Sequence, residues 1–300
     1  MNKILIDGHH LAHKSFHAYN LSTADGLPSG CVYGFLVTLR ALKKRFRDFH
    51  FVVSWDNDAK RKKKIYADYK SNRNHFSLDD PIIDLKKALS SLNITQIEMV
   101  DEEADDVIAS YVEKNKKDGL IYVYSSDKDL FQLIEDGKVI VIKPKTGGYP
   151  EKFFDEEAVL DRYGVTAGIF PCFQAFRGDS IDTIPGVPYL PSKLISSLTS
   201  KYREPTNIYS NLSSEEMTDN QRNKIIAHEE QVYINYEIMR LKRDLDYSVV
   251  EGENDVGVLN EIVNKYEIES ISTEGLVSMF DKESGFLQKQ APAVENISLF

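Results

Sequence analysis

The stretch from Val100 to Ser110 constrains this chain more than any other, because it holds five acidic residues within six positions. It follows an apolar, strand-like segment (Ile97–Val100) and precedes a helical pattern of apolar residues. Carboxylates this close repel one another, and a helix N-terminus offsets only part of that repulsion. A divalent cation would offset the rest. Taken alone, the run also fits a capped, solvated helix start.

Composition indicates an ordinary globular chain. Its 300 residues are 42% hydrophobic and 28% charged, enough for one large domain or two modest ones. The two cysteines, Cys31 and Cys172, have no CxxC spacing, which argues against a disulfide framework or a zinc site. The first apolar run is too short for a signal peptide, and no run reaches membrane-spanning length. We therefore expect a cytoplasmic protein.

The formal net charge of -10 argues by itself against a nucleic-acid partner, because phosphate binding needs cations. Residues 60–73 are an exception, since they hold seven cations and one anion, with Tyr66 and Tyr69 between them. Such a segment can grip a phosphate backbone while its aromatic rings stack on bases. A solvated basic helix is the alternative.

The first half alternates between strand and helix patterns. Apolar runs predict strands at Lys3–Asp7, Phe49–Trp55, Ile97–Val100, Leu120–Ser126 and Val139–Lys143. Helical spacing predicts helices at Leu11–Tyr19, Val32–Phe46 and Pro81–Leu92, and from the acidic run to about Asn115. This alternation predicts a three-layer α/β domain with a mostly parallel sheet over residues 1–154, with the basic segment as an arch at about 57–80.

Strand patterns end near Phe154. Helices are predicted at Asp155–Tyr163, Ile169–Phe176, Ser192–Lys201 and Gln221–Leu241, with a β-like piece at Tyr247–Val250. Residues 155–300 are therefore expected to form a helical domain. Patterning is weak from Ser272 onward, and Gln288–Phe300 is expected to be a loose tail.

Carboxylates follow four of the predicted strands: Asp7, Asp56, the Asp101–Asp106 group, and then Asp127 and Asp129. The carboxyl ends of parallel strands meet at one edge of a sheet, so these side chains are expected to converge. Oxygen ligands without a His or Cys companion predict Mg²⁺ or Mn²⁺. Such ions are typical of enzymes that direct water onto a phosphodiester.

Another acidic pair, Asp179 and Asp182, precedes a Pro-Gly turn in the second half. It could cap a helix, or it could complete the metal site if the helical domain folds back on the sheet.

Six motifs, in order, resemble the structure-specific 5′-nuclease family, which includes flap endonucleases, the 5′-nuclease domain of bacterial DNA polymerases I and phage relatives. They are L-I-D-G at 5–8, V-V-S-W-D at 52–56, Y-K-S-N-R at 69–73, E-A-D-D-V at 103–107, S-D-K-D-L at 126–130 and G-D-S-I-D-T-I-P-G-V at 178–187. The resemblance covers nearly the whole chain. It implies a PIN-like first domain and a helix-hairpin-helix-like region in the second.

The resemblance also implies roles for individual residues. Asp7, Asp56, Glu103 and Asp105 would hold a first metal ion with Asp106 close by, while Asp127, Asp129 and Asp179 would serve a second ion, supported by Asp182 through water. Lys62, Lys63, Lys70 and Arg73 would orient the scissile phosphate. The expected DNA contacts are Lys14, Lys62, Tyr66, Tyr69, Lys70, Arg73 and Lys193.

The chain departs from the family pattern at three places. Lys62 or Lys63 stands where an arginine is usual, which keeps the charge without the bidentate fork. Thr183 replaces a preferred Asn. The Gly-[IV]-Gly-x-Lys hairpin appears as Y-L-P-S-K at 189–193, where proline has no N–H to offer a phosphate. Duplex anchoring there is expected to rely on Lys193.

The resemblance implies a stand-alone 5′-3′ exonuclease and flap endonuclease that uses Mg²⁺, with Mn²⁺ as a substitute. Its partners would be DNA with 5′ ends, flaps or nicks, and RNA/DNA hybrids, during primer or flap removal or 5′-end degradation in a bacterial or phage-infected cell. A single-strand-binding protein or sliding clamp is a further candidate partner. A PIN-like ribonuclease and a catalytically inactive DNA-binding relative are the alternatives.

Overall fold

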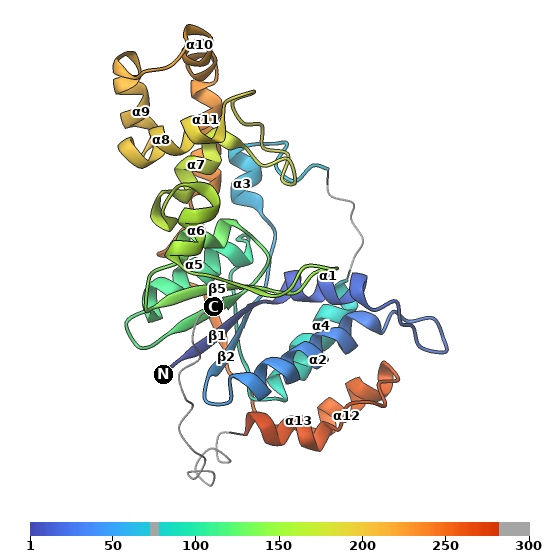
Figure 1. Cartoon of the computed structure of the whole chain (residues 1–300). Helices are drawn as coiled ribbons and strands as arrows, with labels where there is room; N and C mark the ends of the chain where they lie inside the picture. Colours follow the sequence, from blue (N-terminus) through green and yellow to red (C-terminus); the bar gives the residue numbers. More distant parts are fainter. Residues whose placement is uncertain (73–77, 282–300) are drawn as a thin grey trace. The chain divides into compact units, whose positions relative to one another are not determined.

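The computed structural model describes residues 1–72 and 78–281 (Figure 1). The chain folds into two compact units, each assembled from separate segments. The first comprises Met1–His13, His50–Leu78 and Ile97–Val249, and the second comprises Lys14–Phe49, Asp79–Gln96 and Val250–Phe300. Among the helices described, none combines the length and apolar character needed to cross a membrane.

A seven-stranded sheet confirms the α/β prediction, with the strand order β6-β5-β4-β1-β2-β3-β7. The strands are β1 Lys3–Asp7, β2 His50–Ser54, β3 Thr95–Glu98, β4 Ile121–Tyr124, β5 Val139–Lys143, β6 Lys152–Phe154 and β7 Ser248–Val250. β1 pairs in parallel with both β2 and β4, and β4 pairs in parallel with β5, whereas β5 and β6 are antiparallel. Every residue of β1 is buried, as expected for a central parallel strand.

Strand register aligns the carboxyl ends at the middle of the sheet. Asp7 lies opposite Ser54 of β2, and Ile6 lies opposite Tyr124 of β4. The residues that follow these strands therefore emerge at the same edge, which is where ligands bind in open parallel sheets.

The helices of the first unit, apart from α3, contribute buried residues to one hydrophobic cluster that includes the sheet. They are α3 Lys60–Ile65, α5 Ala104–Asn115, η1 Asp129–Leu133, α6 Glu156–Tyr163, η2 Ala167–Ile169, α7 Phe170–Arg177, α8 Ser192–Tyr202, α9 Pro205–Asn211, η3 Leu212–Ser214, α10 Asp219–Ala227 and α11 Glu229–Met239. One apolar cluster runs from Leu5 of the sheet through Phe173 of α7 to Val232 of α11. α7 and α11 contact each other closely (Figure 1).

The predicted single helix at Gln221–Leu241 is wrong, because the structure has α10 and α11 in its place. They divide at His228, whose backbone (φ -113°, ψ 18°) leaves the helical region. α10 also starts earlier than expected, since Thr218 and Gln221 form a capping box that fixes its first turn. β6 was not expected, because three residues give too little alternation to detect.

The second unit packs four helices together: α2 Gly30–Arg45, α4 Asp79–Ser90, α12 Val256–Lys265 and α13 Thr273–Phe280. α12 contacts α4 and α13, and α2 also contacts α4 and α13. The weakly patterned region after Ser272 thus begins with a helix, which the Ser272 side chain caps through the Gly275 N–H. The predicted tail at Gln288–Phe300 lies outside the described residues. Helix α1 (Gly8–Ala18) begins in the first unit and ends in the second.

A buried carboxylate joins α4 to α12. Asp84 accepts hydrogen bonds from the Lys265 ammonium at 2.5 Å and from the Tyr266 hydroxyl at 3.0 Å. Burial acts to raise the pKa of Asp84, but these two hydrogen bonds outweigh burial and lower it. The charged carboxylate therefore stabilises the second unit.

We expect Asp84→Ala to cost about 1–3 kcal/mol of unfolding free energy, because it leaves the buried Tyr266 hydroxyl without its acceptor. Lys87→Ala is the control, since Lys87 lies 3.6 Å from Asp84 on an exposed side chain and exposed pairs contribute about 0–1 kcal/mol. A carboxyl group whose pKa is lower in the folded state stabilises the fold at pH values above its unfolded pKa, and acidification removes this stabilisation. The loss of unfolding free energy in Asp84→Ala should therefore become smaller below about pH 4. Urea titrations that show the same deficit at acidic pH would contradict this assignment.

Candidate functional site

Asp7 ends β1, and α1 begins at the next residue, Gly8. A Cβ at Gly8 would lie 2.7 Å from the Trp55 ring and 2.8 Å from the Ser54 carbonyl oxygen, so only glycine permits this close turn. The turn buries the Asp7 carboxylate, which accepts hydrogen bonds from the His10 N–H and the Ser125 hydroxyl, both at 3.0 Å.

Asp56 follows β2 and reaches across to the acidic run. Its carboxylate accepts the N–H of Ala104, the first residue of α5, at 2.7 Å. One oxygen therefore satisfies an unpaired N–H at the start of a helix, a position that favours negative charge. The side chain stays 39% exposed, which leaves room for a further ligand.

The five acidic residues of the run face different partners. Glu103 is the N-cap of α5 and Asp105 lies in its first turn, and both line a cleft. Asp101 pairs with Lys60 at 2.6 Å, and Glu102 pairs with Arg61 at 3.1 Å. Asp101 and Glu102 are therefore paired with cations of the basic segment.

Glu103 is held by three partners from the basic segment. Its Oε2 accepts from the Lys62 ammonium at 2.7 Å and from the Tyr69 hydroxyl at 2.9 Å, and its Oε1 accepts from Lys70. Burial acts to raise the pKa of Glu103, but the two lysines outweigh burial and hold it well below its usual range.

Asp106 is fully buried and is not among the residues that line the cleft. It accepts from the Arg61 guanidinium at 2.9 Å and the Lys242 backbone N–H at 2.8 Å, and lies 3.3 Å from the Lys62 ammonium. The sequence analysis placed Asp106 beside a metal, but its carboxylate is already engaged by these donors. Arg61 and Lys242 were not expected at the site at all.

Asp127 and Asp129 follow β4. The Asp127 N–H donates to the Ser125 hydroxyl at 3.1 Å, and the Asp127 carboxylate accepts the N–H of Asp129 at 2.8 Å. Ser125 also donates to Asp7, so this one serine links the ends of β1 and β4.

A cleft of about 680 Å³ collects the carboxylates at the strand ends. It is lined by Asp7, Asp56, Glu103, Asp105 and Asp127, together with His9, His10, His13, Asn57, Asp58, Ala59, Lys63, Ala67, Tyr69, Lys70 and Ser71. Five predicted metal ligands thus line a single cavity. Three histidines also line this cleft, because α1 starts directly after Asp7 and its first turns carry them there, although sequence reasoning did not place them at the site.

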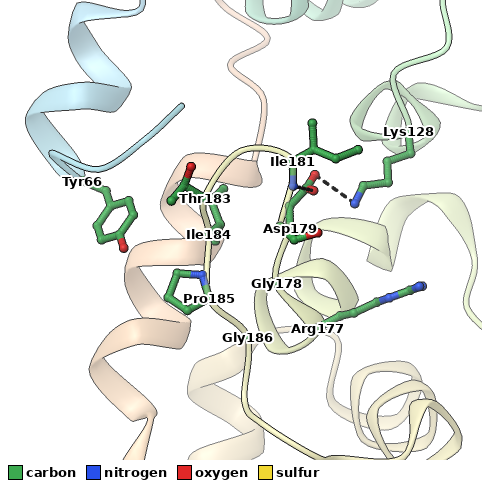
Figure 2. A pocket seen from close by; sticks show the side chains of 11 residues that line it. Tyr66, Lys128, Arg177, Gly178, Asp179, Ile181, Thr183, Ile184, Pro185 and Gly186 are labelled. Carbon is green, nitrogen blue, oxygen red and sulfur yellow. Dashed lines mark hydrogen bonds and ion pairs between the residues drawn. The ribbon is translucent and has the colours of Figure 1, made fainter. Parts of the chain in front are cut away.

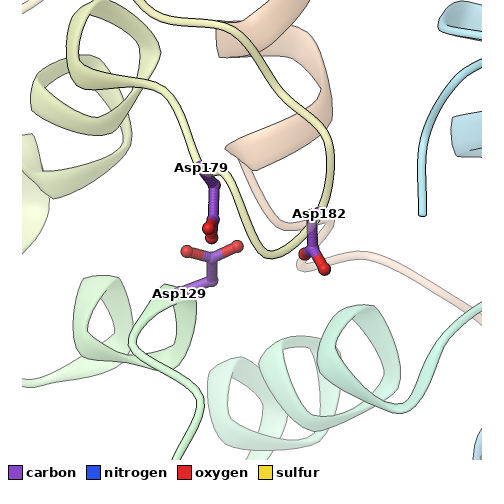
Figure 3. A group of neighbouring side chains, drawn as sticks. All are labelled: Asp129, Asp179 and Asp182. Atoms are coloured by element: carbon purple, nitrogen blue, oxygen red, sulfur yellow. The ribbon is translucent and has the colours of Figure 1, made fainter. Parts of the chain in front are cut away.

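Asp129, Asp179 and Asp182 form a second group, in which one ligand atom of each lies within 4.8 Å of the others. Figure 3 shows the carboxylates of Asp129 and Asp179 facing each other, with Asp182 on the same loop as Asp179. Asp179 also pairs with Lys128 at 2.9 Å. One buried oxygen of Asp129 has no hydrogen-bond partner among the described residues. These oxygen donors and that unsatisfied atom fit a divalent cation.

A tight loop between α7 and α8 carries Asp179 and Asp182. Asp179 and Ile184 exchange two backbone hydrogen bonds of 2.8 Å, and Asn235 of α11 donates to the Ala175 and Pro185 carbonyls. The two glycines of the loop, at positions 178 and 186, lie so close that a Cβ on either would clash with the other's backbone.

Thr183, also on this loop, has φ 62°, and its buried hydroxyl has no partner within the described part of the chain. A β-branched residue is strained at positive φ, which gives a physical reason for the family's preference for Asn there.

The carboxylates of the site repel one another enough to shift their protonation. Burial and the charge of Asp56 raise the pKa of Asp7 to about 7. Burial and the charge of Asp127 raise the pKa of Asp129 to about 8, and the same two causes raise the pKa of Asp105 well above its usual value. Lys62 acts to lower the pKa of both Asp105 and Asp129, but burial and Asp127 outweigh it.

The predicted phosphate-binding residues differ in exposure. Lys62 is 4% exposed, whereas the Lys63 side chain is 50% exposed and pairs with Asp58 at 3.0 Å. Tyr69 is buried with its hydroxyl on Glu103, so stacking of its ring on a base has no geometric support. Tyr66 lines a separate pocket of about 670 Å³ beside the Asp179 loop (Figure 2). Arg73 lies outside the described residues.

The other predicted DNA contacts lie farther along the chain. Lys193 is exposed in the first turn of α8, where Pro191 is the N-cap. Tyr189 has φ 59°, a conformation that suits the glycine of the family pattern. Lys14 lies on α1 and belongs to the second unit.

Known protein families match this chain along most of its length. Residues 2–164 match "5′-3′ exonuclease, N-terminal resolvase-like domain", and residues 165–258 match "5′-3′ exonuclease, C-terminal SAM fold". A 5′-3′ exonuclease of Aquifex aeolicus is 33% identical over 287 residues, covering 93% of this chain and 94% of the relative. The thermostable DNA polymerase I of Thermus thermophilus is 32% identical over 251 residues, covering 82% of this chain but only 29% of the polymerase.

Solved structures share the fold. The T5 5′-exonuclease with bound zinc superposes with a TM-score of 0.65 at 18% identity, covering 94% of this chain and all of that one. The catalytic core of Rad2 in complex with DNA substrate superposes with a TM-score of 0.60 at 15% identity, covering 92% of this chain and 91% of that one. With both family regions matched in order and a full-length relative one-third identical, the chain belongs to the 5′-3′ exonuclease family.

Proposed function

We propose that this chain is a divalent-metal-dependent 5′-to-3′ exonuclease and flap endonuclease that hydrolyses phosphodiester bonds of DNA and of RNA/DNA hybrids. One observation carries the proposal. Five carboxylates from separate strand ends line one cleft, and Lys63 and Lys70 line it too. An anionic metal site bordered by cations suits a phosphodiester, whose charge must be bound and then stabilised as it increases.

We assign the metal to the two carboxylate groups. Asp7, Asp56, Glu103, Asp105 and Asp127 would hold one ion, and Asp129, Asp179 and Asp182 would hold or support a second. Bound there, Mg²⁺ would supply a hydroxide nucleophile and stabilise charge on the phosphate, with Mn²⁺ as a substitute. Asp106 is assigned to holding Arg61 and Lys62, since its carboxylate already accepts from three donors.

The chain's own residues would position the substrate. Lys70 contacts Glu103 and lines the cleft, so its ammonium can bridge the carboxylates and a bound phosphate. Lys63 is exposed at the same cleft and can bind a backbone phosphate. The His10 N–H and the Ser125 hydroxyl fix the Asp7 carboxylate, so it needs no rearrangement to act as a ligand.

The substrate assignment rests on the helical part of the chain. We propose that residues 1–154, together with Asp179 and Asp182, carry the chemistry and that the helices after 155 bind duplex near a 5′ end, flap or nick, with Lys193 as one contact. A structure described as the T5 D15 flap endonuclease in complex with DNA and metal ions has the same fold, which supports this choice. Primer or flap removal in the cytoplasm is the corresponding biological role.

Asp127→Asn should abolish most cleavage. We expect a loss on the order of 10²–10³-fold, the size typical for removing one stabilising group at an active site. The assay is cleavage of labelled 5′-flap, nicked duplex and single-stranded RNA with Mg²⁺, with the exposed carboxylate Asp136→Asn as control. Cleavage of RNA alone would favour the ribonuclease alternative, and no cleavage by the wild type would favour an inactive DNA-binding relative.

Mg²⁺ should stabilise the protein more at alkaline pH. The raised pKa values of Asp7 and Asp129, about 7 and about 8, mean that the metal-free fold holds protons that the unfolded chain has already lost, so its stability falls as pH rises from about 4 to about 8. We therefore expect the increase in Tm on adding Mg²⁺ to be larger at about pH 9 than at about pH 6. Asp7→Asn should raise the metal-free Tm at alkaline pH and reduce the Mg²⁺ effect. An Mg²⁺ effect that does not depend on pH would count against this metal site.

Substitutions of Lys62 and Lys63 should have different effects, on stability for Lys62 and on DNA affinity for Lys63. Lys62→Met leaves the buried Glu103 and Asp106 carboxylates short of a cation, so we expect about 3–5 kcal/mol of destabilisation by urea titration. Lys63→Ala should leave stability nearly unchanged and lower the slope of log affinity for DNA against log salt by about 0.7–0.9, one phosphate contact. Equal stability losses in the two variants would refute the assignment of a structural role to Lys62 and a DNA-binding role to Lys63.

A further inference from the structure

Two consecutive histidines in the first turn of α1 contact the strand ends on either side of β1. His9 accepts the Asp56 N–H, just beyond β2, on its Nδ1 at 2.9 Å. The His9 ring also meets the Trp55 ring edge to face, with centroids 5.5 Å apart. His9 therefore touches the backbone of a residue whose carboxylate lines the cleft.

His10 makes the corresponding contact on the other side. Its Nε2 accepts the Ser126 N–H, just beyond β4, at 3.3 Å, and Ser126 immediately precedes Asp127. The backbone N–H of His10 donates to the Asp7 carboxylate. Three neighbouring strand ends are thus connected through residues 9 and 10.

The hydrogen bonds fix the form of each ring. A ring nitrogen that accepts an N–H carries no proton, so the other nitrogen of a neutral imidazole carries it. His9 accepts through Nδ1 and His10 accepts through Nε2, so the two side chains use opposite nitrogens. Both bonds go to backbone N–H groups beyond the last ladder pair.

We propose that His9 and His10 are positioning residues of the carboxylate site: His9 orients Asp56, and His10 orients the turn that carries Asp127. The proposal rests on the function proposed above. Outer contacts of this kind commonly change metal affinity by about 10–100-fold when they are removed.

Amide substitutions test the two nitrogens separately. The Asn side-chain oxygen is as many bonds from Cα as the His Nδ1, and the Gln side-chain oxygen is as many bonds away as the Nε2. His9→Asn and His10→Gln can therefore keep the acceptor, whereas His9→Gln and His10→Asn displace it. His17→Asn, on an exposed position at the end of the same helix, is the control.

The readout is the Mg²⁺ concentration that gives half of the maximal Tm increase, measured without DNA. We expect His9→Asn and His10→Gln to stay close to wild type, and His9→Gln and His10→Asn to need roughly tenfold more Mg²⁺. A role in ring packing alone would affect both members of each pair equally. If Asn is tolerated only at residue 9 and Gln only at residue 10, the result identifies the acceptor nitrogen of each histidine, even if the metal-free Tm of every variant falls.

Equal Mg²⁺ requirements in all four variants, or equal losses within each pair, would overturn the proposal. A wild type that Mg²⁺ fails to stabilise would instead refute the proposed metal site. The two failures are distinguishable because the wild-type titration is read first, without any substitution.

Discussion

The first unit has to offset the repulsion among its buried carboxylates, and the rest of its structure depends on how it does so. Parallel strands deliver acidic side chains to one edge of the sheet, where burial and mutual charge raise the pKa of Asp7, Asp105 and Asp129. Part of the repulsion is offset by protein groups: the N-terminus of α5, the Ser125 hydroxyl and the lysines on Glu103. The unsatisfied oxygen of Asp129 indicates that a cation supplies the remainder.

The basic segment has two functions that its composition does not distinguish. Lys60, Arg61 and Lys62 are committed to the acidic run, so they stabilise the fold around the cleft. Lys63 is exposed at the cleft and can still meet a phosphate. A formal charge of -10 is therefore a poor guide to nucleic-acid binding here, because it is a sum over the whole chain and does not show that exposed Lys63 lies at the cleft.

The second carboxylate group depends on loop geometry rather than on the sheet. Close packing of two glycines, together with the hydrogen bonds from Asn235, brings Asp179 and Asp182 to Asp129. Thr183 introduces strain into this loop, which shows that the chain tolerates an unfavourable residue when the surrounding hydrogen bonds fix the backbone.

The sequence by itself determined the strands of the parallel sheet, the helices between them and the acids that follow each strand, because apolar periodicity and local turns are encoded in neighbouring residues. It could not decide which acids and lysines face the cleft. Asp105 and Asp106 are adjacent on α5, yet one lines the cleft and the other accepts from Arg61. Successive helical residues point about 100° apart, and only packing against distant segments fixes which direction is the cleft. For the same reason the histidines of α1 became part of the site only in the tertiary structure.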